Sequence, residues 1–397
     1  MHGVTPQEEL KRHNETFILD LIREYGPVSR AQLTLKTGLS AQTITNVVRR
    51  FLDNGLVIET GVLRNGNIGR QPINLDIAAD GAYAIGISIE RDRLIEGVVN
   101  LKGEVVHQGV EVLSGGETPE IMSQKIVKYI TSTMENEHFV KVRDKIAGVG
   151  IGVPGPLHYT SGEVVSPPNL PNWSRVPFRD YIQSKIGKPV VIENNATASA
   201  IGEHWRGKWL SSSFLYCYWG IGIGGGLITN GEVYRGVSGN AVEFGHLVVE
   251  PHGRKCDCGG EGCLERYASI PAILHDISQF GQFKSLEEVV TAAATRPELL
   301  QVLKQAGEYF AQALISAINL FDVDLVIIGG YRFPLVQSIF LPILSANVRS
   351  KTIRSRVADL SIKVSSIGEE STAIGAASLV FHELLLSHTR ERNAKTW

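Results

Sequence analysis

The sequence has few cysteines, no long apolar run and almost no net charge. Four cysteines in 397 residues exclude the dense disulfide scaffold of a small secreted protein. No stretch reaches the ~18–20 consecutive apolar residues that a membrane helix needs, so we expect no membrane partner. The first thirty residues carry charges, among them Lys11, Arg12, Asp20 and Arg23, in place of the apolar core of a signal peptide. We therefore expect a cytoplasmic protein.

Length and charge restrict the possibilities further. A chain of 397 residues exceeds one ordinary hydrophobic core and predicts two or three domains. The 39 basic and 41 acidic side chains give a net charge of -2, which provides no overall attraction to nucleic acid. A DNA-binding function therefore requires a local basic cluster.

The first 78 residues predict three helices and a β-hairpin. Residues 14–25 have apolar side chains at helical spacing, and Gly26-Pro27 ends that helix. Ser29 and Ser40 are suited to cap a second and a third helix. The segments LVIET and INLDI follow as strands on either side of a tip rich in Gly and Asn. This order is typical of a winged helix-turn-helix domain, which we assign to residues 1–78.

Charge within this domain is unevenly distributed. Six basic and two acidic residues lie between Ser29 and Arg70, whereas five acids, Glu15 among them, precede Ser29 and are expected on the opposite side. The third helix of such a domain enters the major groove of DNA. The predicted base-reading residues are Ala41, Gln42, Thr43, Thr45 and Asn46, and the predicted phosphate-contacting residues are Arg49, Arg50 and, on the hairpin, Arg64 and Arg70, which could also enter a narrow minor groove.

The alternative is a packing domain whose arginines are simply solvated. The DNA hypothesis makes operator DNA a partner of this chain. Because one winged helix reads only a half-site, it also predicts a homodimer or a dimer of dimers.

From residue 79 onward, strands and helices occur twice in a similar order. The first set contains the β-rich runs AYAIGISIE, RLIEGVVNL and EVVHQGVEV, a helix near 118–136 and the strands IAGVGIGV and VVIEN. The second set contains FLYCYWG, GGGLITNG and EVYRGV, a helix near 298–320 and the strands DLVIIGG and LSIKVSS. We predict a duplicated α/β fold with lobes at 79–194 and 195–397, the C-terminal helix being free to return to the first lobe.

Three of the four cysteines fall close together, ten residues after a histidine. His246 followed by Cys256, Cys258 and Cys263 supplies one nitrogen and three sulfur ligands, the set that a tetrahedral zinc ion takes. All four positions would be filled by protein, so the site would be structural and not hydrolytic. The alternative is a reduced, shielded thiol cluster. Cys217, in an apolar strand, is expected in the core.

Several motifs together resemble one family. They are VEFGH (242–246), CDCGGEGCLERYAS (256–269), GVGIGVPGPL (148–157), PNLPNW (168–173), IENNATASAIGE (192–203) and GIGIGGGLITNGEVYRG (220–236). In this order they resemble the ROK family, which groups repressors, open reading frames and sugar kinases. The resemblance extends from about residue 80 to the C-terminus, and the N-terminal domain is similar to that of the family's repressor branch.

The resemblance implies an actin-like, ribonuclease-H-like fold of two α/β lobes with a hexose bound in the cleft between them. The sugar-binding residues that it implies are Asn169, Asn194, Asn195, Glu243, His246 and Glu265. Their amides and carboxylates suit a ring of hydroxyl groups. As alternatives, Glu243 and Glu265 could be surface carboxylates, Asn169 a turn former, and the glycines at 222 and 224–226 part of a tight hairpin that touches no phosphate.

Three departures from the family's kinases argue against catalysis. Those kinases carry Asp-x-Gly-Gly-Thr after the first strand, where this chain reads GISIERDRL. Their catalytic aspartate is replaced by Asn195, whose amide cannot act as a general base, and a threonine of the second phosphate loop is replaced by Ile221. We therefore predict no catalytic residue and a sugar-responsive repressor of carbohydrate-utilisation genes. The alternatives are a ROK sugar kinase with a fused DNA-binding domain and a zinc-stabilised scaffold.

Overall fold

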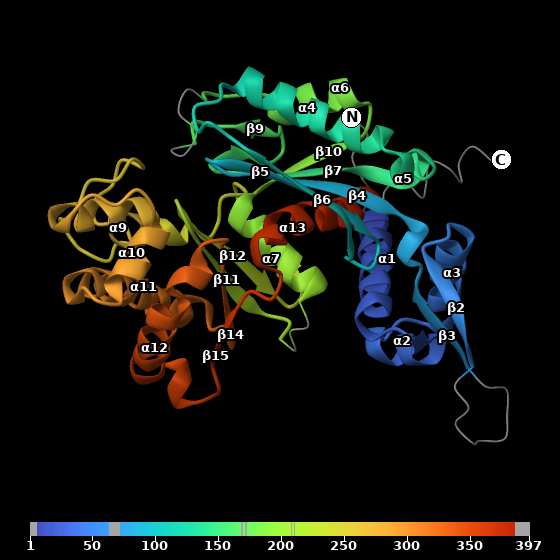
Figure 1. Cartoon of the computed structure of the whole chain (residues 1–397). Helices are drawn as coiled ribbons and strands as arrows, with labels where there is room; N and C mark the ends of the chain where they lie inside the picture. The colour runs from blue at the N-terminus through green and yellow to red at the C-terminus, as the bar shows by residue number, and fades with distance from the viewer. Residues whose placement is uncertain are drawn as a thin grey trace.

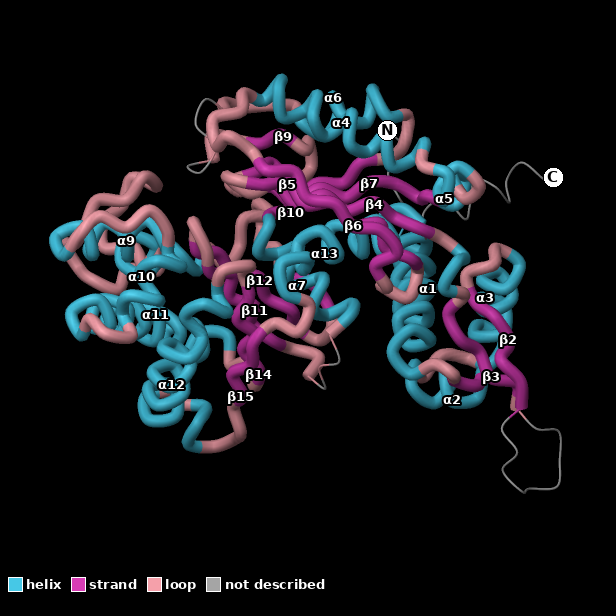
Figure 2. The backbone as a smooth tube through the Cα atoms, in the orientation of Figure 1, coloured by secondary structure: helices cyan, strands magenta, loops and turns pink. Residues whose placement is uncertain are grey.

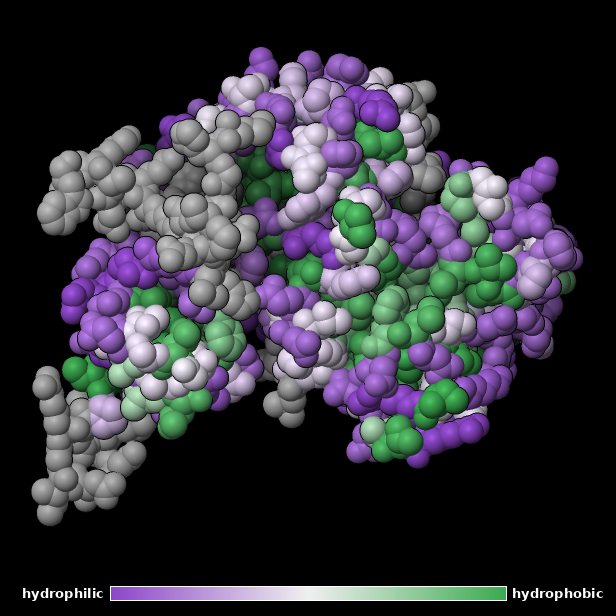
Figure 3. Space-filling model, turned by 180° about the vertical axis from the view of Figure 1, so that it is seen from behind, coloured by the Kyte–Doolittle hydropathy of each residue, from purple (hydrophilic) through white to green (hydrophobic). Residues whose placement is uncertain are grey.

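The computed structural model describes residues 6–62, 72–167, 170, 173–207, 209 and 211–385. Its elements form a small N-terminal module and two larger α/β lobes (Figure 1). The outer surface seen in Figure 3 is mostly hydrophilic, and hydrophobic residues show in patches toward its middle. Among the described helices, none combines the length and the apolarity that crossing a bilayer requires.

The N-terminal module has the element order expected from the sequence. It consists of α1 (Pro6–Tyr25), β1 (Val28–Ser29), α2 (Arg30–Thr37), α3 (Ala41–Asp53), β2 (Val57–Val62) and β3 (Ile73–Ile77), with the sheet order β1-β3-β2. Ser29 caps α2 in a capping box with Gln32, and Ser40 caps α3. Helix α1 begins at Pro6 and not at residue 14. The sequence did not reveal its first turns, because they are polar and carry no apolar periodicity.

The module does not have a core of its own. Helix α3 buries Ile44, Val47, Val48 and Phe51 on one face, as its spacing predicts. The same hydrophobic cluster continues through α1 into the body, where it includes Trp205. The N-terminal module is therefore packed against the lobes and is not suspended on a linker.

The first lobe is built on a five-stranded sheet of order β10-β7-β4-β5-β6. Its strands are β4 (Tyr83–Ile89), β5 (Arg93–Asn100), β6 (Val105–Val112), β7 (Ile146–Val153) and β10 (Val190–Asn194). Helices α4 (Pro119–Glu135) and α6 (Phe178–Ile186) cover one face, above the sheet in Figure 1, and α13 (Ser371–Val380) lies against the other. The C-terminal helix thus returns to the first lobe.

The second lobe repeats this plan with the sheet order β13-β12-β11-β14-β15. Its strands are β11 (Phe214–Trp219), β12 (Ile223–Thr229), β13 (Glu232–Val233), β14 (Leu325–Gly329) and β15 (Ser361–Val364). In both sheets three strands form an antiparallel meander, and two later strands add in parallel beside its first strand. The duplicated α/β fold predicted from the sequence is confirmed.

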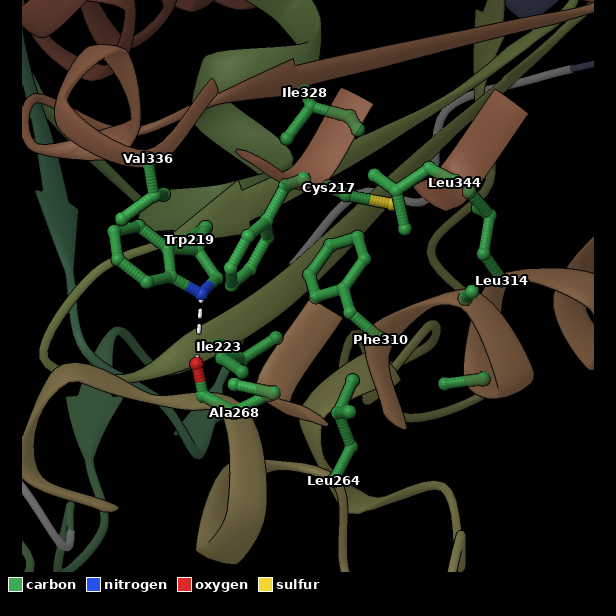
Figure 4. Packing of buried hydrophobic residues seen from close by; sticks show 14 of the residues in the cluster. Cys217, Trp219, Ile223, Leu264, Ala268, Phe310, Leu314, Ile328, Val336 and Leu344 are labelled. Atoms are coloured by element: carbon green, nitrogen blue, oxygen red, sulfur yellow. Dashed lines mark hydrogen bonds between the residues drawn. The ribbon is translucent and has the colours of Figure 1, made fainter. Parts of the chain in front are cut away.

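The core of the second lobe lies between its sheet and a helical layer. This layer includes α9 (Ile270–Ile277), α10 (Leu286–Ala293), α11 (Pro297–Phe321) and α12 (Phe333–Lys351). Trp219 and Phe310 meet in the cluster shown in Figure 4, and the Trp219 indole donates a hydrogen bond of 2.8 Å to the Ala268 carbonyl. Cys217 is fully buried there, as predicted for a core residue.

Helices α7 (Asn195–Arg206) and α13 lie between the two sheets (Figure 2). They approach so closely that a Cβ atom at Gly375 would lie 1.6 Å from the Ala198 carbonyl oxygen. Helix α7 also packs on β12, and α13 packs on β4. The pair is therefore the structural connection between the lobes.

Candidate functional site

A cavity of about 490 Å³ opens between the lobes. Side chains with polar groups in its lining include Glu90, Asn194, Asn195, Tyr218, Asn240, Glu243, His246 and Glu265. Five of the six sugar-site residues implied by the family resemblance are in this list, and the sixth, Asn169, lies outside the described residues. The predicted residues therefore line one cavity, although they come from distant parts of the chain.

Asn194 and Asn195 stand where β10 meets α7. The Asn194 side chain caps the helix by accepting a hydrogen bond of 2.9 Å from the Ala196 amide. The Asn195 amide donates to the Ile89 carbonyl at 2.8 Å, but its Oδ1 is buried and has no hydrogen-bond partner. An unsatisfied buried acceptor is costly, so the Asn195 Oδ1 atom retains the capacity to accept a hydrogen bond.

Two carboxylates lie on the opposite wall. The Glu265 carboxylate is fixed by the Ile223 amide, which donates to it at 2.8 Å. Desolvation at the cavity wall raises the pKa of Glu243 and also that of Glu265. Glu265 is half-buried, whereas the Glu243 side chain is 48% exposed, so the alternative of a surface carboxylate stays open for Glu243.

His246 has one ring nitrogen on each side. Its Nδ1 lies 3.6 Å from Cys256 Sγ, and its Nε2 lies 4.0 Å from Glu243 Oε2. The ring thus lies between Cys256 and Glu243, and Cys258 of the cluster also lines the cavity. The two predicted roles of His246, metal ligand and cavity residue, use different nitrogen atoms.

The cysteine cluster has the dimensions of a metal site. The ligand atoms of His246, Cys256, Cys258 and Cys263 lie within 4.8 Å of one another. Cys258 Sγ and Cys263 Sγ are 3.7 Å apart, and two sulfurs each ~2.3 Å from a tetrahedral ion would be about 3.8 Å apart. The donor set and its spacing can therefore hold a metal ion.

The sequence did not single out Glu90 and Tyr218 at the cavity. Glu90 follows β4, where GISIERDRL replaces the kinase phosphate loop, and its carboxylate accepts a hydrogen bond of 2.8 Å from the Tyr218 hydroxyl. Burial raises the pKa of Glu90 to about 7. The sequence contained a signal for Glu90, because this acidic residue stands where the kinases of the family have a phosphate-binding loop.

Contacts across the mouth of the cavity were also missed. Asn240 of the second lobe pairs with the Leu157 backbone, accepting from its amide at 3.0 Å and donating to its carbonyl at 2.9 Å.

The run EVYRGV was expected as a full strand, but β13 ends at Val233. Beyond that strand, Arg235 forms a 2.9 Å ion pair with the buried Glu193. A tertiary ion pair of this kind leaves no periodic pattern in the sequence.

The glycines of GIGIGGG have a packing role in part. A Cβ atom at Gly226 would lie 2.7 Å from the Ala196 carbonyl oxygen, and one at Gly225 would lie 2.7 Å from the Val242 side chain. Both positions are inside β12, where the strand passes close to α7. Gly222 and Gly224 line the cavity.

Helix α3 presents the predicted polar face to solvent. Ala41, Gln42, Asn46 and Arg49 are exposed, and Thr43 and Thr45 are half-buried. The Gln42 amide donates to Asn46 Oδ1 at 3.0 Å. These positions are compatible with contacts to DNA, whereas Arg64 and Arg70 lie outside the described residues.

The expected separation of charge in this module is wrong at one point. Glu15 was placed on the side opposite the basic face, but its almost buried carboxylate pairs with Arg50. Helix α1 packs against α3, so an acid that precedes Ser29 in sequence reaches the arginine of α3. Arg50 is therefore engaged within the protein, and Arg49 is the freely exposed arginine of α3.

Comparisons with known proteins agree with this architecture. Residues 84–383 match the model of the ROK family. The xylose repressor of Caldicellulosiruptor bescii is 29% identical over 95% of this chain and 97% of its own. The glucokinase of Thermotoga maritima is 34% identical over an aligned region that covers 58% of this chain and 78% of the glucokinase. A crystal structure of a ROK family transcriptional regulator, a homologue of the E. coli Mlc protein, has a TM-score of 0.79 at 26% identity, covering 96% of this chain and 98% of its own.

A duplicated two-lobed body with an N-terminal helical module and a polar interlobe cavity defines a transcriptional regulator built on a sugar-kinase fold. The chain belongs to the ROK family.

Proposed function

We propose that this protein is a repressor that binds operator DNA through its N-terminal module and releases it in response to a sugar bound between the lobes. One observation carries the proposal. A cavity lined by amides and carboxylates occurs in the same chain as a helix, α3, whose polar face is exposed. A ligand in the cavity changes DNA affinity if it binds two arrangements of the lobes with different affinities.

The N-terminal module would act as a winged helix-turn-helix. Helix α3 would enter the major groove, where Gln42 and Asn46 suit bidentate contacts to adenine. Their mutual hydrogen bond would then be exchanged for bonds to the base. Arg49 would contact phosphate, and the hairpin residues Arg64 and Arg70 are proposed to extend the contact.

The sugar would be a monosaccharide held by both lobes. Asn195 Oδ1 would accept a hydrogen bond from one sugar hydroxyl, and the Glu243 and Glu265 carboxylates would accept hydrogen bonds from other hydroxyl groups. Asn169 and Asn194 complete the proposed set. The sequence suggested a hexose, and the name of the Caldicellulosiruptor relative makes D-xylose, a pentose, the first sugar to test.

The cysteine cluster is proposed to bind zinc. One histidine and three cysteines fill a tetrahedral zinc completely, so the ion would serve structure and leave no position for water. It would hold the loop that carries Glu265, while His246 Nε2 remains on the cavity side. Zinc would thus stabilise the sugar-binding wall without acting on the sugar.

We infer that the site does not catalyse phosphoryl transfer. Asn195 cannot accept a proton from a sugar hydroxyl near pH 7, and the turn after β4 offers the Glu90 carboxylate where a phosphate would need donors. The alternative function, a sugar kinase with a fused DNA-binding domain, is favoured by the similarity to kinases of the family, the Thermotoga maritima glucokinase among them.

Thermal-shift titration with D-xylose, D-glucose, N-acetyl-D-glucosamine and their phosphates tests the sugar site. A DNA sequence selected from a random pool, then measured with and without the best sugar at fixed salt, tests regulation. We expect a stabilising sugar that weakens DNA binding by a homodimer or dimer of dimers. Sugar-dependent ATP hydrolysis would establish the kinase alternative. A protein that binds neither sugar nor DNA would be a scaffold.

A further inference from the structure

Helix α7 runs from the cavity to the N-terminal module. Its first residue, Asn195, lines the cavity, and every residue from there to Glu203 is buried. Such a helix is held on all sides and has little freedom to bend. A displacement at the cavity end therefore reaches Trp205 at the other end.

Arg23 of α1 contacts α7 at Trp205, near the C-terminal end of that helix. Its guanidinium carbon lies 4.4 Å from the centroid of the Trp205 ring, and its Nη1 donates a hydrogen bond to the Trp205 carbonyl. Its Nε lies 3.6 Å from Asp20 Oδ1, and the arginine side chain is only 10% exposed. A cation held over an indole and away from water makes a strong and directional contact.

Trp205 has no room to move independently. Its ring packs against Phe381 at a centroid distance of 5.9 Å, and a Cβ atom at Gly103 would lie 2.7 Å from its Cδ1. A shift of α7 is therefore transmitted to Arg23 and is not absorbed by a rotation of the indole.

Helix α1 carries the contact onward to α3. Glu15 lies two turns before Arg23 on α1 and pairs with Arg50 of α3. The Glu15 side chain is 4% exposed, so the pair is enclosed on one side. Three helices are thus connected in series, from the cavity through α7 and α1 to the exposed face of α3.

We propose that Arg23 is a coupling residue, and that its contact with Trp205 transmits the sugar-bound state of the cavity to α3. The inference rests on the proposed function, because it needs both a sugar and a DNA site. It assigns to Arg23 a positioning role, since this residue touches neither ligand.

A second contact between the same bodies provides a matched control. Lys102 Nζ, in the turn after β5, lies 2.9 Å from Asp76 Oδ2 of β3. This ion pair joins the N-terminal module to the first lobe and includes no atom of α7, although the neighbouring Gly103 packs against Trp205. If coupling passes through α7, losing this pair weakens the interface but does not interrupt the transmission.

The experiment compares the full-length protein with the variants Arg23→Met, Arg23→Lys and Lys102→Met. For each one, calorimetric titration gives the sugar affinity, and fluorescence anisotropy gives the affinity for the selected DNA with and without saturating sugar. The measured quantity is the ratio of the two DNA affinities, typically ~5–150-fold in coupled systems. We expect Arg23→Met to lower this ratio at least about fivefold while sugar affinity and sugar-free DNA affinity change less than about twofold.

The outcomes separate the two proposals. If the wild type binds no sugar or no DNA, the proposed function fails and Arg23 has nothing to couple. If the wild type responds to sugar and Arg23→Met keeps the full ratio, the coupling role is overturned. It is also overturned if Lys102→Met lowers the ratio equally, because coupling would then depend on the whole interface. Arg23→Lys retains the positive charge, so we expect it to restore part of the ratio of DNA affinities. Such a partial recovery would show that the low ratio of Arg23→Met is not due to a folding defect.

Discussion

Asn195 and Glu90 are the two residues that most clearly separate sensing from phosphorylation. An amide at the first position of α7 keeps a hydrogen bond to a hydroxyl group but cannot remove its proton. A carboxylate in the turn after β4 places negative charge where a phosphate would have to approach. Under the proposed function, both residues keep polar groups at the cavity, so that a sugar would be bound and not phosphorylated.

Glu90 gives a prediction about pH. Its pKa in the folded protein, about 7, lies above the ordinary value of 4.5, so the native state holds a proton that the unfolded chain releases. As the pH rises from 4.5 through 7, the wild type should lose up to about 3 kcal/mol more stability than Glu90→Gln, in which Glu96, whose pKa is also raised to about 7, still titrates. Melting temperatures of both proteins from pH 4 to 8.5 measure this. A difference between them that does not change with pH would contradict the assignment.

Glu243 gives a prediction about the ligand. Removing its carboxylate should abolish the sugar-induced thermal shift, because a hydroxyl acceptor on the cavity wall is lost. The affinity of sugar-free protein for DNA should be unchanged. Glu135→Ala, which removes an exposed glutamate at the end of α4, is the control. A Glu243→Ala variant with a normal sugar response would remove this residue from the site.

The cavity residues could be predicted because the short motifs that contain them carry the family resemblance, which implies their positions. Asn194, Asn195, Glu243 and Glu265 each stand beside a helix start, a glycine or a cysteine that marks the position in sequence. The partners that hold the cavity together could not be predicted. Asn240 meets Leu157 through a contact that spans 83 residues of chain and depends on how the lobes pack.

At the scale of elements, the helices of the N-terminal module were predictable because their ends carry local signals. Ser29, Gly38 and Ser40 adopt the capping conformations that their residue types favour. The ion pair between Glu15 and Arg50 was not predictable, since it depends on the crossing of α1 over α3. Pattern reasoning therefore identified the exposed polar face of α3, but it did not predict that Arg50 pairs with Glu15.

The crossing of α7 and α13 predicts a strong steric effect. Gly375→Ala would place a methyl group 1.6 Å from the Ala198 carbonyl oxygen, so the helices must separate. We expect the free energy of unfolding to fall by about 2–3 kcal/mol or more, measured by urea denaturation. Gly116→Ala, where nothing lies within 4 Å of the added atom, should leave stability nearly unchanged. Equal effects at both positions would argue against close packing of the two helices.

Helix α3 predicts a salt-dependent effect. Arg49 is exposed, so Arg49→Ala should weaken operator binding and reduce the slope of log affinity against log salt by about one phosphate contact. Lys141→Ala, at an exposed position of the first lobe, should change neither quantity. An unaltered slope for Arg49→Ala would count against major-groove docking by this face of α3.

At the scale of the whole molecule, the proposed zinc site would connect stability with sugar binding. Chelation should lower the melting temperature and weaken sugar binding, because the loop holding Glu265 loses its cross-link. Sugar-free DNA binding should persist, since the cluster lies in the second lobe. Calorimetry before and after dialysis against a chelator measures both effects. The variant Cys258→Ser should respond little to chelation, and a full response would place the metal elsewhere.

The duplicated body was predictable because each half repeats the same order of strands and helices in sequence. The packing of the N-terminal module against the body was not predictable. The apolar residues of α1 give the same helical pattern whether they are buried within the module alone or in a core shared with the body. The structure joins them in one hydrophobic cluster that extends from Ile18 to Phe381.

That shared core has a consequence for the operator. In a dimer of such proteins, the distance between the two reading helices is set by the bodies and not by a flexible tether. Half-sites on DNA must then be spaced to match, and each inserted base pair adds about 3.4 Å and roughly 34–36° of rotation that the protein cannot follow. The operator should therefore tolerate changes in the bases between its half-sites far better than changes in their number.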